Sequence, residues 1–266
     1  MNIGFMQGRF VDSEKKNTLQ YFPARNWKKE ITLSKKNGFN IMEWTINYEN
    51  INQNHLYSQK KNDELLKFLK TNSIKITSVT CDFFMQKPFF KVKNSGKLLS
   101  DLKKVIQFSK KVGVKYIVLP LVDQSSIENS KQERFLIQKI KKISKILHKG
   151  QKILFEIDYP PKKIYEFMKK LNNKFGINYD TGNSASLGFD FDEEKKYMKY
   201  IYNIHIKDRK FRGPSVRLGK GDFDFKNFFL YLKKFNYKGN LILQTARSRN
   251  HVREIILNRK FVEKFI

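Results

Sequence analysis

Two charged side chains lie inside short apolar runs, where a polar group needs a partner. Glu156 stands in the run Ile-Leu-Phe-Glu-Ile, and His205 stands in the run Ile-His-Ile. Because burying an ionised carboxylate alone is costly, Glu156 must face a cation or hydrogen-bond donors. A structural ion pair with a lysine is the alternative interpretation for Glu156, and a satisfied core position is the alternative for His205.

The same two residues belong to a polar set that recurs at the ends of predicted strands. Asp180 and Gln244 fall at the equivalent depth of neighbouring strands. Two carboxylate oxygens, one imidazole nitrogen and one amide oxygen can hold one divalent metal ion. Because most of these donors are oxygens, Mn²⁺ or Mg²⁺ is favoured, with Zn²⁺ as the alternative. We therefore expect a metal site formed by Glu156, Asp180, His205 and Gln244.

The elements that must position these residues alternate along the chain. Short apolar, β-branched or aromatic runs indicate strands, and longer lysine-rich segments of helical period indicate helices. We expect strands near 2–6, 39–44, 74–80, 115–121, 152–157, 176–180, 201–206 and 240–245. We expect helices near 26–37, 58–71, 97–112, 131–148, 161–173, 192–199, 225–236 and 249–264.

This alternation predicts a parallel sheet. Five glycines each separate a predicted helix from the next strand, where a left-handed helix cap is tolerated: Gly38, Gly113, Gly150, Gly176 and Gly239. An open doubly wound sheet would be expected to carry a glycine-rich phosphate loop, and the segment 6–10 is not one. The chain has 266 residues, and a (β/α)8 barrel needs about 250. We expect a single TIM-barrel domain over residues 1–266.

The active site of such a barrel forms at the carboxyl ends of the strands. Residues near these ends that could bind a small anionic or polyol substrate are Gln7, Arg9, Glu43, Asn183 and Arg247. The loop 207–224 adds Arg209, Arg212 and Arg217, and guanidinium groups suit bidentate capture of phosphate or carboxylate. Ordinary surface charge explains these arginines equally well. Glycines 213, 219 and 221 would let the loop fold over a ligand.

The chain carries a formal net charge of +29. Nucleic acid or an anionic membrane would suit such a surface. However, the lysines are spread over the whole length, as expected of a compositional bias, so we expect neither a specific nucleic-acid partner nor a membrane partner. Cys81 is the only cysteine, and the start of the chain lacks the features of a signal peptide. We expect a cytoplasmic protein, and a homodimer is compatible with the sequence.

The ordered set of motifs resembles the xylose isomerase-like TIM barrel superfamily, in its sugar-phosphate isomerase/epimerase branch. The matching segments are Met-Gln-Gly-Arg at 6–9, Gly-Phe-Asn-Ile-Met-Glu-Trp at 38–44, Phe-Glu at 155–156, Asp-Thr-Gly-Asn at 180–183, His-Ile-Lys-Asp at 205–208, Leu-Gly-Lys-Gly-Asp at 218–222 and Leu-Gln at 243–244. The resemblance implies a metal held by Glu156, Asp180, His205 and Gln244. It also implies that the residues of strands 5 and 8 act as an acid–base pair.

The chain departs from this family at strand 8, where Gln244 replaces a glutamate and cannot take a proton. It also has Asn183 where the family often has histidine. We expect an isomerase or epimerase in which Glu156 abstracts a proton next to a carbonyl. The second group would be Asp158, Lys207, Asp208 or a metal-bound water. The alternatives are a sugar-acid dehydratase or lyase, an apurinic-site endonuclease, and a metal-free binding protein.

Overall fold

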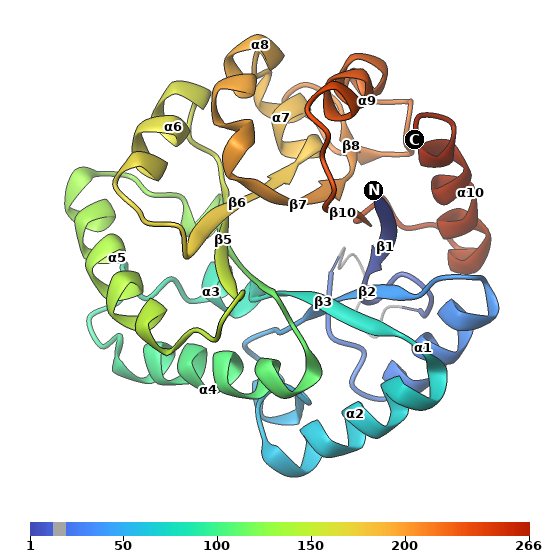
Figure 1. Ribbon diagram of the computed structural model, residues 1–266, viewed down its shortest axis with the longest axis horizontal. Helices are drawn as coiled ribbons and strands as arrows, with labels where there is room; N and C mark the ends of the chain where they lie inside the picture. Colours follow the sequence, from blue (N-terminus) through green and yellow to red (C-terminus); the bar gives the residue numbers. More distant parts are fainter. Residues whose placement is uncertain (13–19) are drawn as a thin grey trace.

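The computed structural model describes residues 1–12 and 20–266, and its centre is a closed barrel of parallel strands (Figure 1). The strands pair in the order β1-β10-β7-β6-β5-β4-β3-β2, so the first strand closes on the last. The predicted fold class, a (β/α)8 TIM barrel, is confirmed. The barrel strands are β1 (Asn2–Met6), β2 (Ile41–Thr45), β3 (Lys75–Thr80), β4 (Tyr116–Leu121), β5 (Lys152–Ile157), β6 (Phe175–Asp180), β7 (Ile201–Ile206) and β10 (Asn240–Leu243).

Helices form a ring outside the strands and cover the barrel (Figure 1). Seven of them match predicted helices: α1 (Trp27–Lys36), α2 (Gln59–Asn72), α4 (Gly96–Val112), α5 (Ser130–Ile143), α6 (Pro161–Lys169), α9 (Phe225–Lys234) and α10 (His251–Glu263). The helix predicted near 192–199 is divided into α8 (Phe191–Glu194) and a 3₁₀ helix, η4 (Lys195–Tyr200). Shorter 3₁₀ turns are η1 (Ile51–Gln53), η2 (Asp123–Ser125) and η3 (Ser144–Ile146).

Two short helices begin directly at strand ends and had not been predicted. They are α3 (Asp82–Gln86), which follows β3, and α7 (Thr181–Leu187), which follows β6. The carboxylate of Asp180 caps α7 by accepting a hydrogen bond from the backbone N–H of Asn183, at 2.8 Å. Both helices are too short to show a hydrophobic period. Their position matters because each begins at the mouth of the barrel.

Three of the five predicted glycine caps are confirmed, and two are wrong. Gly38, Gly113 and Gly150 have φ angles of +75°, +85° and +82°. Gly176 and Gly239 are not left-handed. Gly176 lies inside β6, where a Cβ would overlap the ring of Tyr202 and the side chain of Leu154. A glycine is therefore needed here because a larger side chain would not fit, and not because of its backbone conformation.

The predicted loop 207–224 contains a small antiparallel hairpin of β8 (Asp208–Arg209) and β9 (Ser215–Val216). The Asp208 carboxylate accepts hydrogen bonds from the backbone N–H groups of Gly219, at 2.9 Å, and Gly221, at 2.8 Å. A Cβ at Gly221 would overlap that carboxylate. Asp208 and Gly221 thus fix the shape of this segment.

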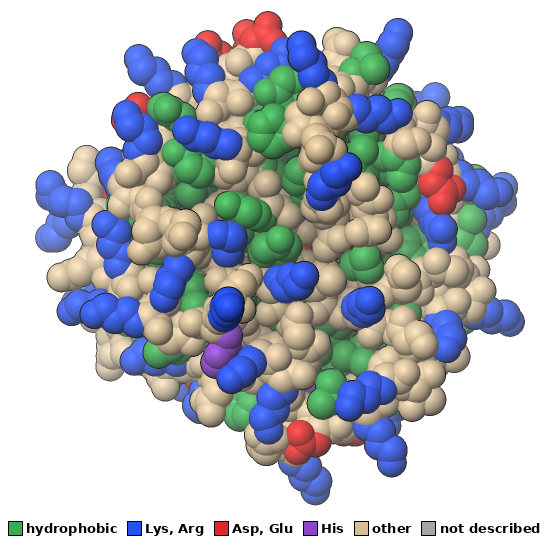
Figure 2. Space-filling model, in the orientation of Figure 1, with side chains coloured by type: hydrophobic (Ala, Val, Ile, Leu, Met, Phe, Trp, Pro, Cys, Tyr) green, Lys and Arg blue, Asp and Glu red, His purple; other side chains and the backbone are tan. Residues whose placement is uncertain are grey.

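Lysine and arginine side chains are scattered over the face drawn in Figure 2, with few acidic groups between them. They do not gather into one stripe on that face, in keeping with a compositional origin of the charge. No helix in the described part of the chain is long and apolar enough to cross a membrane.

The packing around Gly176 gives a stability prediction. Gly176→Ala should lower the free energy of unfolding by about 1–3 kcal/mol, the usual cost of overpacking a core. The same change at Gly96, in the first turn of α4, where a Cβ would make only an ordinary van der Waals contact with Asn94, should be neutral or stabilise by up to about 1 kcal/mol. Urea unfolding followed by circular dichroism measures both. Equal effects of the two substitutions would contradict the packing argument.

Candidate active site

Three neighbouring strands bring a buried histidine and two carboxylates together at the mouth of the barrel. Glu156 lies on β5, Asp180 ends β6 and His205 lies on β7, with Asp180 and His205 paired in register. One potential ligand atom from each residue lies within 4.8 Å of the others. Because the strands are parallel, their carboxyl ends meet at one edge, as the sequence predicted.

The imidazole of His205 is completely buried and is held at both nitrogens. Its Nε2 lies 2.7 Å from Oε1 of Glu43, a fully buried carboxylate on β2 across the barrel. Its Nδ1 lies 3.2 Å from Oε2 of Glu156 and 3.0 Å from Nδ2 of Asn178. Glu43 therefore fixes the ring so that Nδ1 faces the two carboxylates of the mouth.

The charges of this group depend on one another. Burial alone would lower the pKa of His205, but the carboxylates of Glu43 and Glu156 outweigh it and raise that pKa to about 10. Burial would raise the pKa of Glu43, but His205 and the hydroxyls of Ser78 and Thr80 hold it below its ordinary value. The carboxylates thus require a positive charge at or beside the imidazole.

Two buried oxygens at the mouth are available to a ligand. Among the residues that the structure describes, Oδ2 of Asp180 and Oε1 of Gln244 accept no hydrogen bond. Gln244 donates its Nε2 to Oε1 of Gln20 at 2.5 Å, which leaves its own oxygen free. A buried oxygen without a donor is costly unless a cation binds it. The donor set of Glu156, Asp180, His205 and Gln244 therefore fits a divalent metal ion.

A cavity of about 380 Å³ opens above this group. Glu156, Gln244 and Asn183 form part of its wall, and Nδ2 of Asn183 donates to Oε1 of Glu156 at 2.8 Å. Lys207 and Arg209 bring positive charge to the same wall. The ammonium of Lys207 lies 3.9 Å from Oδ2 of Asp180. The cavity has the size and polarity expected of a site for a small anionic or polyol molecule.

Several residues predicted to bind substrate lie outside this cavity. Gln7 is fully buried and accepts from the backbone N–H of Thr45 at 3.0 Å. Glu43 lies below the mouth against His205, so it supports the site without reaching a ligand in the cavity. Arg9 donates to the carbonyl of Thr245, and the exposed Arg217 pairs with Glu254 on α10 at 2.7 Å.

Arg247, predicted to bind substrate, and Asp208, predicted to act in catalysis, both have partners outside the cavity. The Arg247 guanidinium donates to the carbonyls of Gly8 and Val11, at the edge of the β1 loop. The Asp208 carboxylate is occupied by the backbone N–H groups of its own loop. Of the seven predicted substrate-binding residues, Asn183 and Arg209 line the cavity. Arg9 and Arg247 donate instead to backbone carbonyls, and Arg217 pairs with Glu254.

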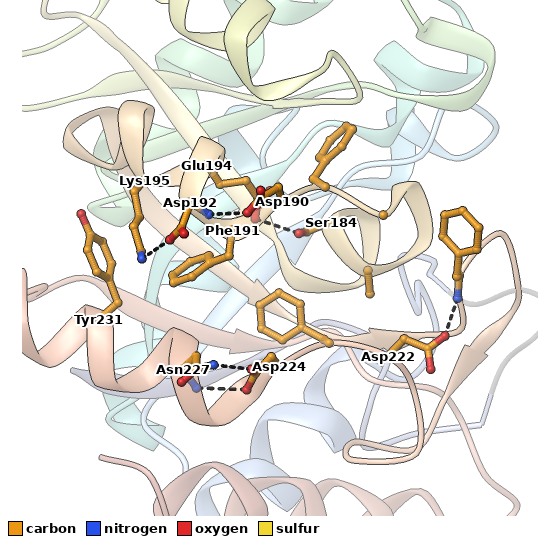
Figure 3. Close-up of a pocket in the computed structure, with 15 residues that line it drawn as sticks. Ser184, Asp190, Phe191, Asp192, Glu194, Lys195, Asp222, Asp224, Asn227 and Tyr231 are labelled. Atoms are coloured by element: carbon orange, nitrogen blue, oxygen red, sulfur yellow. Dashed lines mark hydrogen bonds and ion pairs between the residues drawn. The ribbon is translucent and has the colours of Figure 1, made fainter.

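A larger cavity of about 540 Å³ lies between α7, α8, α9 and the 211–224 segment (Figure 3). Its wall is acidic and aromatic, but its carboxylates already have partners. Asp190 and Asp224 cap α8 and α9, Asp192 pairs with Lys195, and Asp222 pairs with Lys210. These contacts give the acidic residues a structural role.

Several polar residues beneath the mouth were not assigned to the site from the sequence. Asn178 and Asn203 lie on the inner face of β6 and β7, where Nδ2 of Asn203 donates to Glu43 at 2.8 Å. Gln20 accepts a hydrogen bond from the amide of Gln244. This contact could not be predicted because the two residues are far apart in the sequence. The asparagines were detectable, since each is a polar residue inside an apolar strand with the same period as Asp180 or His205.

Comparison with known proteins gives consistent results. The profile of the family described as "Xylose isomerase-like TIM barrel" matches residues 31–264. L-ribulose-5-phosphate 3-epimerase UlaE of Salmonella heidelberg is 25% identical over 256 residues, covering 89% of each chain. A xylose isomerase-like TIM barrel protein of Mycobacterium smegmatis, solved with magnesium, has a TM-score of 0.75 at 14% identity and covers 99% of this chain and 96% of its own.

A sugar-bound structure shares the fold as well. D-allulose 3-epimerase of a Methylomonas species, solved with D-allulose, has a TM-score of 0.76 at 12% identity. The match covers 100% of this chain and 97% of that chain. At these identities the structural likeness establishes the fold.

The role of Glu43 can be tested by metal binding. Glu43→Gln keeps the size of the side chain but removes the charge that orients His205, so Mn²⁺ affinity should fall about 10–100-fold. Isothermal titration calorimetry on metal-free protein measures this change. Glu254→Gln, which removes a carboxylate from the distant Arg217 pair, is the control and should bind Mn²⁺ like the unaltered chain. An unchanged affinity in Glu43→Gln would disprove the supporting role.

Proposed function

Because the chain belongs to the xylose isomerase-like TIM barrel family, we propose that it is a divalent-metal-dependent isomerase or epimerase of a small sugar, sugar phosphate or related polyol. The observation that carries this proposal is the buried group of Glu156, Asp180 and His205, in which Oδ2 of Asp180 has no donor, together with the likewise unpartnered Oε1 of Gln244. The similarity to an L-ribulose-5-phosphate 3-epimerase supports the sugar-epimerase class.

The proposed chemistry is proton abstraction from the carbon next to a carbonyl. When bound, a divalent cation polarises the carbonyl and hydroxyl oxygens of the sugar and makes this proton more acidic. Glu156 is the base, because its carboxylate lies at the cavity wall and Asn183 orients one of its oxygens. Asp180 and His205 are the ligands that would hold the cation, and Gln244 would add a neutral oxygen ligand.

The cations around the cavity favour an anionic substrate. Lys207 is mostly buried, and it lines the cavity together with Arg209, whose guanidinium also donates to the carbonyl of Gly213. Because the surface as a whole is also strongly basic, an anionic sugar would be attracted over some distance at low ionic strength. A sugar phosphate is therefore our preferred substrate, with an uncharged ketose as the second.

Gln244 favours a second candidate reaction. An amide cannot return a proton, and one base with one metal suffices for dehydration of a sugar acid or retro-aldol cleavage. Product analysis separates the two functions. Metal-loaded protein is incubated with L-ribulose 5-phosphate and with D-allulose in deuterated water, and the products are resolved by NMR. An epimer labelled at the α-carbon supports the proposal, and cleavage or dehydration products support the alternative.

The base can be tested directly. Glu156→Gln keeps an oxygen that can bind the metal but cannot accept a proton. Turnover should fall by about 10²–10⁴, typical of a lost acid–base group, while part of the Mn²⁺ binding remains. Turnover is measured by epimer formation and metal binding by calorimetry. Retention of full turnover in this variant would exclude Glu156 as the base.

Gln244→Glu tests whether the glutamine is a weakened base. The new carboxylate adds negative charge beside the metal ligands, so Mn²⁺ should bind more tightly. The same charge repels an anionic substrate and raises the pKa of a neighbouring carboxyl group, so turnover should fall. Both are measured beside the unaltered chain. A several-fold rise in turnover would contradict this prediction and restore the reaction that uses the strand-8 residue as a base.

A further inference from the structure

One carboxyl group at the mouth has no role in the reaction described so far. Asp82 follows β3 as the first residue of α3, is 5% exposed and lines the same cavity as Glu156 and Gln244. Within the described part of the chain, its side chain makes no hydrogen bond or ion pair. Its oxygens are not among the fully buried atoms without a partner, so they are open to the cavity that Asp82 lines.

Asp82 and Glu156 line one cavity from strands on either side of β4. β3 ends at Thr80, which pairs with Val118 of β4, and Asp82 begins α3 two residues later. Glu156 lies on β5, where it pairs with Pro120 of β4. Asp82, Pro120 and Glu156 all line the cavity. The two carboxyl groups therefore reach the same space from different strands.

The other acidic residues at this end of the barrel are occupied or exposed, and Asp123, which also lines the cavity, is exposed to solvent. Asp208 accepts backbone N–H groups of its own loop, and the carboxylate of Asp158 accepts the hydroxyl of Ser126. The ammonium of Lys207 lies 3.9 Å from Oδ2 of Asp180, and Asp180 is one of the proposed metal ligands. Asp82 thus has both access to the cavity and an uncommitted carboxyl group.

We propose that Asp82 is the second acid–base residue of the reaction and takes the role that Gln244 cannot perform. This inference rests on the proposed function. A substrate carbon held between the two carboxyl groups turns one face towards each. Glu156 takes the proton from one face as the C–H bond breaks, and the Asp82 carboxyl group gives its proton to the other face as the new C–H bond forms. Glu156 is then protonated and Asp82 ionised, and proton exchange with water restores both.

The environment of Asp82 suits a proton donor. Burial and, next, the charge of Glu156 raise the pKa of Asp82 to about 8, although His205 partly opposes this. A carboxyl group in that range holds a proton at neutral pH and can release it during a reaction. The raised pKa agrees with the placement of Asp82, on which the argument stands.

Asp82→Asn tests the inference, because the amide keeps the shape and cannot donate a carboxylic proton. L-ribulose 5-phosphate is incubated with the Mn²⁺-loaded variant in deuterated water. Epimer formation should fall at least about 10²-fold, whereas deuterium should still enter the recovered substrate through Glu156. Mn²⁺ affinity should stay within a few-fold of that of the unaltered chain. Asp192→Asn, the same change in the first turn of α8, should leave all three measurements unaltered.

Two results would overturn the role of Asp82. One is epimer formation by Asp82→Asn within several-fold of the unaltered rate. The other is a parallel loss of exchange and of Mn²⁺ binding, which would make Asp82 a structural support of the mouth. Failure of the proposed function looks different, because the unaltered chain itself would then bind no Mn²⁺ or leave both L-ribulose 5-phosphate and D-allulose unchanged and unlabelled.

Discussion

The burial of several carboxyl groups around a single histidine is the constraint on which the mouth of this barrel depends. Glu43 and Glu156 contact opposite nitrogens of His205, and Asp180 lies beside them. Like charges in a space of low dielectric constant repel strongly, so the group is stable only with positive charge among the carboxylates. A proton on His205 or a divalent cation at its Nδ1 can supply that charge, which links the electrostatics of the fold to its proposed chemistry.

In the closed barrel, residues from distant parts of the chain stabilise these buried charges. Glu43 reaches His205 from the other side of the barrel, and Asn203 on β7 donates to Glu43. The hydroxyls of Ser78 and Thr80 complete the shell of that carboxylate. Both oxygens of Glu43 therefore have donors, whereas Oδ2 of Asp180 and Oε1 of Gln244 at the mouth have none.

The sequence predicted the barrel well because its strands and helices have distinct periods and similar spacing throughout. It also predicted Glu156, Asp180 and His205 at one edge, since parallel strands align their ends. It did not predict that Glu43 would contact the histidine, because sequence patterns do not say which strands face each other across the interior. The arginines were misjudged for a related reason, since Arg217 and Arg247 find partners that only the folded chain supplies. The helix α3 was hidden by its shortness.

The central claim is that His205, held by Glu43, completes a site for one divalent cation. The most direct measurement is the binding of Mn²⁺ to metal-free protein, followed by electron paramagnetic resonance in the unaltered chain and in His205→Ala. The account predicts a single tightly bound Mn²⁺ per chain that is lost in the variant, while circular dichroism shows that the variant remains folded. Equal Mn²⁺ binding by the two folded proteins, or none by either, would contradict it.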